Sequence, residues 1–275
     1  MALRPLSLAH LTVIDADPIT LIEAAAVGGF NAIGLRVVPP FATDTIVPVI
    51  GQRDLQRQIK RRLREVAITI LDIEAVWLTR ETRVCQLKPA LETGAELGAQ
   101  YVLTVGYDDE KARLVENFAK FCELADACGL RAMLEFIPYS TVKSLKDACE
   151  LLTVAAPANA GVLIDALHLS RSGGHPSQIK ALDPTLFSYV HLCDAPLRQP
   201  ATDQLREEAR GQRSYPGDGE LWLDAFLDAF PRTTPVAVEA PNAAFSHLPV
   251  AERALRVGKA TRGLLRRHDG AEQDA

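Results

Sequence analysis

Short apolar runs alternate along the chain with longer segments that carry a helical period. Most of these runs are rich in Val, Ile and Leu and do not alternate with polar residues, which is typical of strands buried on both faces of a parallel sheet. The runs are Leu6–Leu11, Ala32–Val38, Ile68–Ile73, Tyr101–Val105, Arg131–Ile137, Gly161–Ile164, Tyr189–Leu192 and Val236–Val238. We therefore predict eight parallel strands.

The segments between these strands have the end signals of helices. Asp17 is a favourable N-cap before Pro18, and Gly28-Gly29 follows the first helix. The predicted helices are Pro18–Val27, Asp54–Glu65, Val84–Leu97, Asp109–Cys128, Val142–Ala155, Pro176–Leu182, Leu221–Phe230 and Pro249–Arg266. Strict alternation of strands and helices predicts an α/β fold, a single (β/α)8 TIM barrel.

A doubly wound open sheet is the structural alternative. That fold usually has a glycine-rich phosphate turn after its first strand, and the segment from His10 to Asp17 contains no glycine. The 275 residues divide into about 34 per βα unit, close to the ~30 residues that a strand and helix need. We predict one barrel domain over 1–267 and a flexible polar tail over 268–275, with His247 and His268 exposed.

Composition narrows the classes of partner. Hydrophobic residues make up 48% of the chain and the formal net charge is -5, so nucleic acid is a poor default partner. The five cysteines include no CxxC pair, which indicates reduced thiols. Neither a signal peptide nor an apolar run of 18 residues occurs, so we expect a soluble cytoplasmic protein without a membrane partner. The expected partner is a small-molecule substrate, and a homo-oligomer is left open.

Ionisable groups end the four late strands. They are Glu135, Asp165, His191 and Glu239. Catalytic groups of a barrel lie at the C-terminal ends of its strands, so these side chains are expected to converge. Three buried carboxylates would repel one another, and a divalent cation removes that conflict. The donor set suits Mn²⁺, which we prefer, with Mg²⁺, Co²⁺ and Zn²⁺ as alternatives.

The motifs around these positions resemble a known family. They are Leu134-Glu135-Phe136-Ile137-Pro138, Asp165-Ala166-Leu167-His168, His191-Leu192-Cys193-Asp194, Arg213-Ser214-Tyr215-Pro216-Gly217-Asp218-Gly219 and Val238-Glu239. Together they resemble the sugar phosphate isomerase/epimerase superfamily, the xylose-isomerase-like TIM barrels, over nearly the whole chain.

The resemblance implies roles for individual residues. Glu135, Asp165, His191 and Glu239 would bind one divalent metal, and the two glutamates would act as acid and base on opposite faces of a substrate. His168 would either contact the substrate or support a metal ligand, and Arg213 would hold the substrate. We also assign His168, Asp194 and His10 to the substrate site. Arg36 and Glu74, near the ends of the second and third strands, either line the pocket or are structural.

The implied activity is that of an isomerase or epimerase. Its substrate would be a small polyhydroxylated keto compound (a sugar, sugar phosphate or inositol-like molecule) that loses a proton beside a metal-bound carbonyl. A dehydratase of the 3-dehydroshikimate or keto-inositol type uses the same groups, and a non-catalytic binding protein is the third alternative. A phosphodiesterase is disfavoured because no histidine lies beside Arg36 or Ile73. The polar segment over 195–212 is longer than in the simple sugar epimerases of the family, and its role is left open; long functional loops often act as lids or specificity elements.

Overall fold

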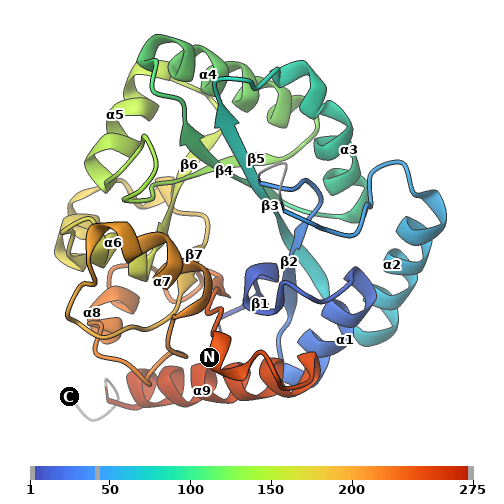
Figure 1. Ribbon diagram of the computed structural model, residues 1–275, viewed down its shortest axis with the longest axis vertical. Coiled ribbons are helices and arrows are strands. Elements are labelled where there is room, and N and C mark those ends of the chain that lie inside the picture. Colours follow the sequence, from blue (N-terminus) through green and yellow to red (C-terminus); the bar gives the residue numbers. More distant parts are fainter. Residues whose placement is uncertain (1–3, 41–43, 272–275) are drawn as a thin grey trace.

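Eight parallel strands form a closed barrel, in which each strand pairs with its neighbours in chain order and β1 also pairs with β8 (Figure 1). The computed structural model describes residues 4–40 and 44–271. The strands are β1 (Leu6–Leu8), β2 (Ala32–Arg36), β3 (Thr69–Thr79), β4 (Tyr101–Tyr107), β5 (Arg131–Glu135), β6 (Ala160–Asp165), β7 (Val190–Leu192) and β8 (Val236–Val238). The predicted single (β/α)8 barrel is confirmed, and the open sheet is excluded.

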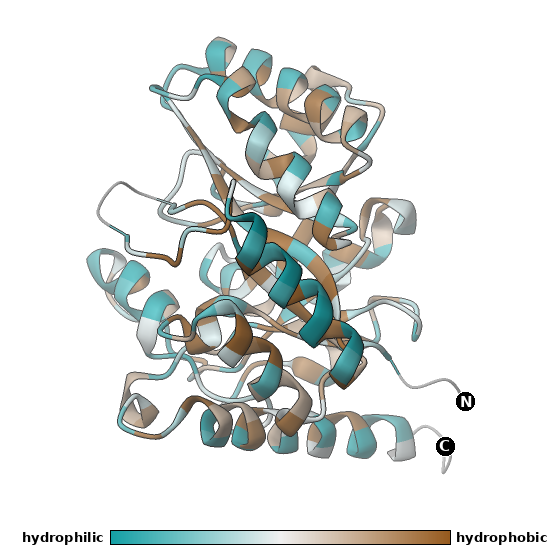
Figure 2. Cartoon of the chain, turned by 90° about the vertical axis from the view of Figure 1, so that its right-hand side faces the viewer, coloured by the Kyte–Doolittle hydropathy of each residue, from teal (hydrophilic) through white to brown (hydrophobic). Residues whose placement is uncertain are grey.

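Helices surround the barrel and present hydrophilic outer faces (Figures 1 and 2). They are α1 (Pro18–Gly28), α2 (Arg53–Val66), α3 (Lys88–Leu97), α4 (Lys111–Ala127), α5 (Leu145–Ala155), α6 (Ala166–Arg171), α7 (Leu205–Gly211), α8 (Leu223–Leu227) and α9 (Val250–Ala271). The carboxylate of Asp17 accepts hydrogen bonds from the backbone N–H groups of Ile19 and Thr20, as the predicted N-cap requires. No helix in the described ranges has the length and apolar character that a membrane span needs.

The predicted sixth helix is wrong. Residues Pro176–Ala181 form a 3₁₀ turn, and the α-helix after the sixth strand is α6. It begins directly at the strand end because the side chain of Asp165 accepts a hydrogen bond from the backbone N–H of His168 at 2.9 Å and so caps the helix. Likewise α7 lies inside the predicted loop over 195–212, and β3 continues beyond its predicted end to Thr79.

The predicted start of the C-terminal tail is also too early. Helix α9 continues to Ala271, and His268, which we expected to be exposed, is only 6% exposed. Its Nε2 lies 2.8 Å from Oδ1 of Asp228, so a partner distant in the sequence holds the polar end of the helix. Residues 272–275 of the predicted tail lie outside the described residues, whereas His247 is exposed as predicted.

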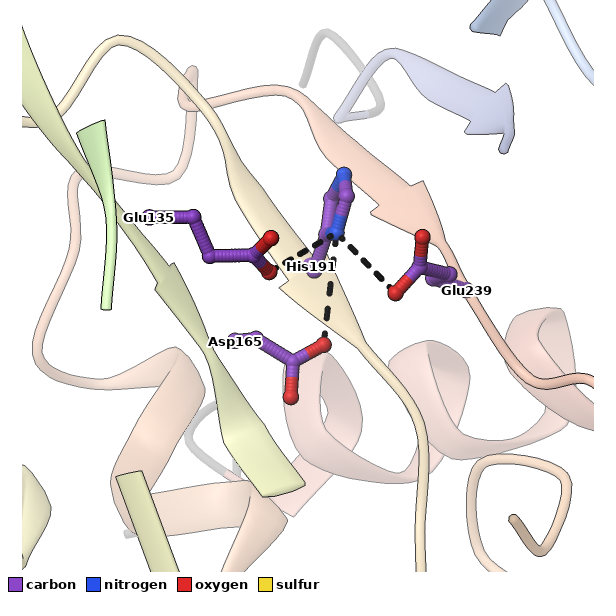
Figure 3. A group of neighbouring side chains, drawn as sticks. All are labelled: Glu135, Asp165, His191 and Glu239. Atoms are coloured by element: carbon purple, nitrogen blue, oxygen red, sulfur yellow. Dashed lines mark ion pairs between the residues drawn. The ribbon is translucent and has the colours of Figure 1, made fainter. Parts of the chain in front are cut away.

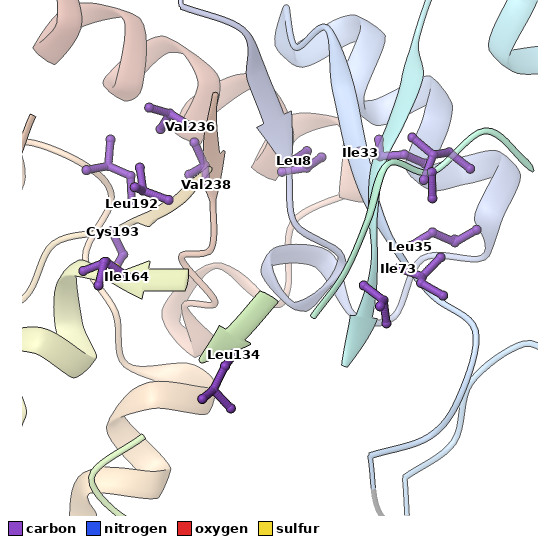
Figure 4. Close-up of a cluster of buried hydrophobic side chains, with 14 of the residues drawn as sticks. Leu8, Ile33, Leu35, Ile73, Leu134, Ile164, Leu192, Cys193, Val236 and Val238 are labelled. Carbon is purple, nitrogen blue, oxygen red and sulfur yellow. The ribbon is translucent and has the colours of Figure 1, made fainter. Parts of the chain in front are cut away.

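Side chains of the strands alternate between two apolar layers. Ile33, Leu35, Leu134, Ile164 and Val238 belong to the large core between barrel and helices (Figure 4). A smaller cluster inside the barrel contains Ala32, Met133, Leu163, Tyr189 and Ala237. Because successive side chains of a strand point to opposite faces, the residues two and four positions after a member of the inner cluster also face inward. This alternation directs Arg36, Glu135, Asp165, His191 and Glu239 into the barrel at its C-terminal end.

Candidate metal and substrate site

The four strand-end residues predicted to converge lie together at the C-terminal end of the barrel (Figure 3). One ligand atom from each of Glu135, Asp165, His191 and Glu239 lies within 4.8 Å of the others. Nδ1 of His191 is 3.7 Å from Glu135 Oε1, 4.0 Å from Asp165 Oδ2 and 3.6 Å from Glu239 Oε2. All four side chains are buried.

The hydrogen bonding of this cluster is incomplete. Both ring nitrogens of His191 and Oε1 of Glu135 are buried without a hydrogen-bond partner among the described residues. Most buried polar atoms of folded proteins have such a partner, so these atoms call for a ligand. Carboxylate oxygens together with one imidazole fit a hard or borderline divalent cation. The residues present therefore fit a metal ion.

The electrostatics of the cluster reflect crowded negative charge. Burial and the charge of Glu239 raise the pKa of Glu135 well above its ordinary value. Burial alone would lower the pKa of His191, but the neighbouring carboxylates, with Glu239 first among them, raise it to about 10. Burial likewise opposes ionisation of Glu239, yet Arg213 and His191 lower its pKa strongly. A divalent cation would relieve the repulsion that produces these shifts.

Arg213, which we expected to hold the substrate, contacts two members of the cluster. Its Nη1 donates to Asp165 Oδ2 at 2.6 Å, and its Nη2 lies 2.9 Å from Glu239 Oε2. The side chain is 1% exposed, and its Nε donates to the backbone carbonyl of Ala209 in α7 at 2.8 Å. The long segment after β7 therefore helps to place this guanidinium beside the carboxylates.

His168 lies beside the cluster, on the helix that Asp165 caps. Its ring meets the ring of Tyr139 edge to face, with centroids 5.9 Å apart. Burial lowers the pKa of His168 to about 4, so its imidazole is neutral at neutral pH. Tyr139 also lines a cavity of about 1110 Å³ over the ends of β3 and β4 and the loop after β5.

His10 does not match its predicted role in substrate binding. It lies in a 3₁₀ turn after β1, where its Nδ1 accepts from the backbone N–H of Arg36 at 3.1 Å and its Nε2 lies 2.9 Å from the carbonyl oxygen of Ala16. Burial lowers the pKa of His10 to about 4, so Nε2 donates as the neutral tautomer. Both ring nitrogens are occupied by backbone groups, which makes this histidine structural.

Asp194, also expected at the substrate site, binds backbone instead. Its Oδ1 accepts from the N–H groups of Ala195 at 2.9 Å and Leu221 at 3.0 Å, and its Oδ2 accepts from that of Gly217 at 3.0 Å. This buried carboxylate ties the turn around Gly217 to the end of β7. The residue therefore orders the loop that follows Arg213.

Sequence reasoning missed two buried polar groups near the site. Asp72 lies in β3 and accepts a hydrogen bond from the hydroxyl of Tyr189 at 2.7 Å. Glu208 of α7 binds Arg171 through two hydrogen bonds of 2.7 and 2.9 Å. The sequence did contain a signal for Asp72, because two acidic residues, Asp72 and Glu74, lie two positions apart in an otherwise apolar strand. The sequence contained no such signal for Glu208, because its role depends on Arg171, which is distant in the sequence.

Comparison with known proteins places this geometry in context. The profile of the xylose isomerase-like TIM barrel family matches residues 22–261. Inosose isomerase of Bacillus subtilis (strain 168) is 26% identical over 156 residues, which cover 53% of this chain and 54% of that protein. A 3-dehydroshikimate dehydratase of Pseudomonas aeruginosa (strain PAO1) is 33% identical over 138 residues, 48% of this chain and 21% of that protein. The matches thus span about half of the inosose isomerase and less of the dehydratase.

A solved structure has the same fold. The crystal structure of the IOLI protein with a bound zinc atom superposes with a TM-score of 0.76 at 20% identity, covering 96% of this chain and 99% of that chain. The enzymes named in these comparisons act on small molecules as isomerase or dehydratase.

Proposed function

Because the chain belongs to the xylose isomerase-like TIM barrel family, we propose that it is a divalent-metal-dependent isomerase or epimerase of a small polyhydroxylated keto compound. The observation that carries the proposal is the buried cluster of Glu135, Asp165, His191 and Glu239, in which the imidazole nitrogens lack hydrogen-bond partners. These four residues would hold the metal. Mn²⁺ is the preferred ion, and the zinc-containing relative of the same fold supports Zn²⁺ as an alternative.

We assign proton transfer to the two glutamates. When bound, a divalent ion polarises a substrate carbonyl and acidifies the adjacent C–H. Glu135 comes from β5 and Glu239 follows β8, and they lie on opposite sides of His191 (Figure 3). A substrate held between them presents one face to each carboxylate, so one can remove a proton and the other can return it.

Neighbouring side chains orient these groups. Arg213 keeps Glu239 ionised through their 2.9 Å contact, which maintains a proton acceptor on the β8 side. Neutral His168 can donate to or accept from a substrate hydroxyl without adding charge.

A dehydratase is the second candidate function. The observation that favours it is the 33% identity over 138 residues to a 3-dehydroshikimate dehydratase. The same acid and base serve this reaction, since removal of a proton beside a carbonyl can be followed by expulsion of a β-hydroxyl as water. The two reactions differ in their products and not in the residues described above.

Product analysis in D₂O tests both candidates. The Mn²⁺-loaded protein is incubated with a keto-inositol, with keto sugars and with 3-dehydroshikimate, followed by NMR and mass spectrometry. C–H exchange with retention of all oxygens supports the isomerase or epimerase, whereas loss of water supports the dehydratase. Exchange should vanish in Glu239→Gln. If no compound shows exchange or turnover, the proposal is contradicted, and a non-catalytic binding protein is the remaining alternative.

A further inference from the structure

Two charged residues face the candidate metal cluster from the opposite wall of the barrel. Arg36 is the last residue of β2 and pairs in register with Glu74 of β3, whereas the cluster comes from β5 to β8. Ile33 and Leu35 point outward into the helix-facing core (Figure 4), so Arg36 points inward. Arg36 and Glu74 are 5% and 1% exposed, which places both in the same buried layer as the cluster.

The contact between these two side chains is incomplete. Nε of Arg36 and Oε2 of Glu74 are 3.7 Å apart, which is too long for a hydrogen bond. Both atoms are buried, and neither has a hydrogen-bond partner in the described part of the chain. The other oxygen of Glu74 is already used, since it accepts from the backbone N–H of His10 at 3.0 Å. The Nε–H donor of Arg36 and the Oε2 acceptor of Glu74 are thus neighbouring and unpaired on the inner face of β2 and β3.

A hydroxyl group matches this pair. Its oxygen can accept from the Nε–H of Arg36 while its proton is donated to Oε2 of Glu74, so one group satisfies both atoms. The pair also lies within electrostatic reach of the cluster: Arg36 contributes to the low pKa of Glu239, after Arg213 and His191. A substrate that spans the barrel from the cluster to this wall would therefore meet both.

The charges around this space disfavour an anionic substrate. Glu135, Asp165, Glu239, Asp72 and Glu74 supply five carboxylates in the barrel interior. Two arginines and a divalent cation supply four positive charges in return. With all five carboxylates ionised, these groups carry one net negative charge, and Oε2 of Glu74 stays an acceptor. No positive excess remains to attract a substrate carboxylate.

We propose that Arg36 and Glu74 are specificity-determining residues that bind a hydroxyl group of the substrate opposite the metal cluster, so that the site selects an uncharged polyhydroxylated ketone. This inference rests on the proposed function, because it concerns the substrate of the same site. It favours keto-inositols and neutral keto sugars over carboxylated compounds such as 3-dehydroshikimate.

The test compares affinities for matched ligands. Binding of a keto-inositol, of its deoxy analogues that each lack one hydroxyl, and of 3-dehydroshikimate is measured by calorimetry on the Mn²⁺-loaded protein. We expect Arg36→Met and Glu74→Gln each to weaken keto-inositol binding by ~10- to 100-fold, as the loss of a buried hydrogen bond does. One deoxy analogue should bind the wild type and both variants equally, because it lacks the hydroxyl that the pair holds.

Controls separate recognition from folding. Arg4→Met removes another buried arginine, which lies just before β1 and donates to the carbonyl of Leu227 in α8. This variant should leave keto-inositol affinity unchanged. Metal content by elemental analysis should stay the same in Arg36→Met and Glu74→Gln. An equal loss of affinity for the keto-inositol and for every deoxy analogue would overturn the inference, since a general distortion of the site behaves in this way.

Two further outcomes also count against it. Tighter binding of 3-dehydroshikimate than of the keto-inositol to the wild type would contradict selection of an uncharged ligand, as would no binding of the keto-inositol at all. Failure of the proposed function is seen separately, as a bound keto-inositol whose C–H bonds do not exchange in D₂O. In that case the affinity pattern still decides whether Arg36 and Glu74 hold the hydroxyl.

Discussion

Substitution of Glu135 in the cluster should change the free energy of unfolding in opposite directions with and without bound metal. Burial and the charge of Glu239 raise the pKa of Glu135, so an ionised Glu135 costs stability when no cation balances it. We predict that Glu135→Gln raises the free energy of unfolding of the metal-free protein, because a neutral side chain replaces a carboxyl group whose ionised form is disfavoured there. In excess Mn²⁺ the same change should be destabilising, because a ligand is lost. Denaturant titrations with and without EDTA measure both; a stability loss in EDTA would contradict the prediction.

Removal of Glu239 should separate metal binding from folding. In Glu239→Gln a neutral amide replaces the carboxylate that lies 3.6 Å from His191, so we expect metal affinity to fall ~10-fold or more, together with loss of activity. Circular dichroism should be unchanged. Elemental analysis after dialysis checks the metal content, and a full complement in the variant would show that Glu239 is not a ligand.

The buried imidazole of His10 predicts how stability depends on acid. Its pKa is lowered by burial to about 4 from the ordinary 6.5, so the unfolded chain binds a proton more readily than the folded protein. The stabilising effect is complete above pH 6.5 and is lost as the pH falls towards 4, up to about 3 kcal/mol for a shift of this size. His10→Gln should flatten the fall in unfolding free energy between pH 6.5 and 4. Parallel curves for wild type and variant would contradict this.

The same residues show what the sequence could and could not predict. Glu135, Asp165, His191 and Glu239 were found because charged groups end apolar strands, and strand ends meet in a barrel. His10 and Asp194 obey the same rule, yet their side chains bind backbone groups of Ala16, Arg36, Gly217 and Leu221. Position along a strand does not reveal which distant N–H or carbonyl group will occupy a polar side chain.

Among the secondary-structure elements, the short helices were not predicted because they are too short to show a hydrophobic period of 3.6 residues. Helix α6 has six residues and α7 has seven, so neither completes two turns. Tertiary contacts hold them instead: the Asp165 cap begins α6, and Arg171 of α6 binds Glu208 of α7. The segment over 195–212 is therefore anchored at α7 by a buried ion pair.

This ion pair yields a prediction about Arg213. Glu208→Ala leaves Arg171 buried without its partner and should lower the unfolding free energy by about 3 kcal/mol. It should also lower kcat/KM, since the carbonyl of Ala209 in the same helix holds Nε of Arg213. The double variant Arg171→Met with Glu208→Leu should recover most of the stability. Urea unfolding and steady-state kinetics measure the two effects, and an unchanged kcat/KM in a folded Glu208→Ala would exclude a role of α7 in positioning Arg213.

For the whole molecule, metal binding and folding should be coupled. The cluster draws on β5, β6, β7 and β8, so it exists only when half of the barrel is assembled. At Mn²⁺ concentrations about 1,000 times the dissociation constant, linkage adds about 4 kcal/mol of stability, which corresponds to about 10 °C in Tm for a domain of this size. Calorimetry with Mn²⁺ and with EDTA tests this, with Glu239→Gln as the control whose Tm should rise less on addition of Mn²⁺, because its metal affinity is lower. An equal Tm in both buffers would contradict a metal site at the cluster.

The closed order of strands divides the barrel into two walls. The candidate acid, base and metal ligands come from β5 to β8, whereas Arg36 and Glu74 come from β2 and β3. Mutations on one wall need not disturb side chains on the other. A lineage with this architecture can therefore exchange substrates by altering early strands while its proton-transfer groups stay the same, and directed evolution of new specificity should begin with randomised positions in β2 and β3.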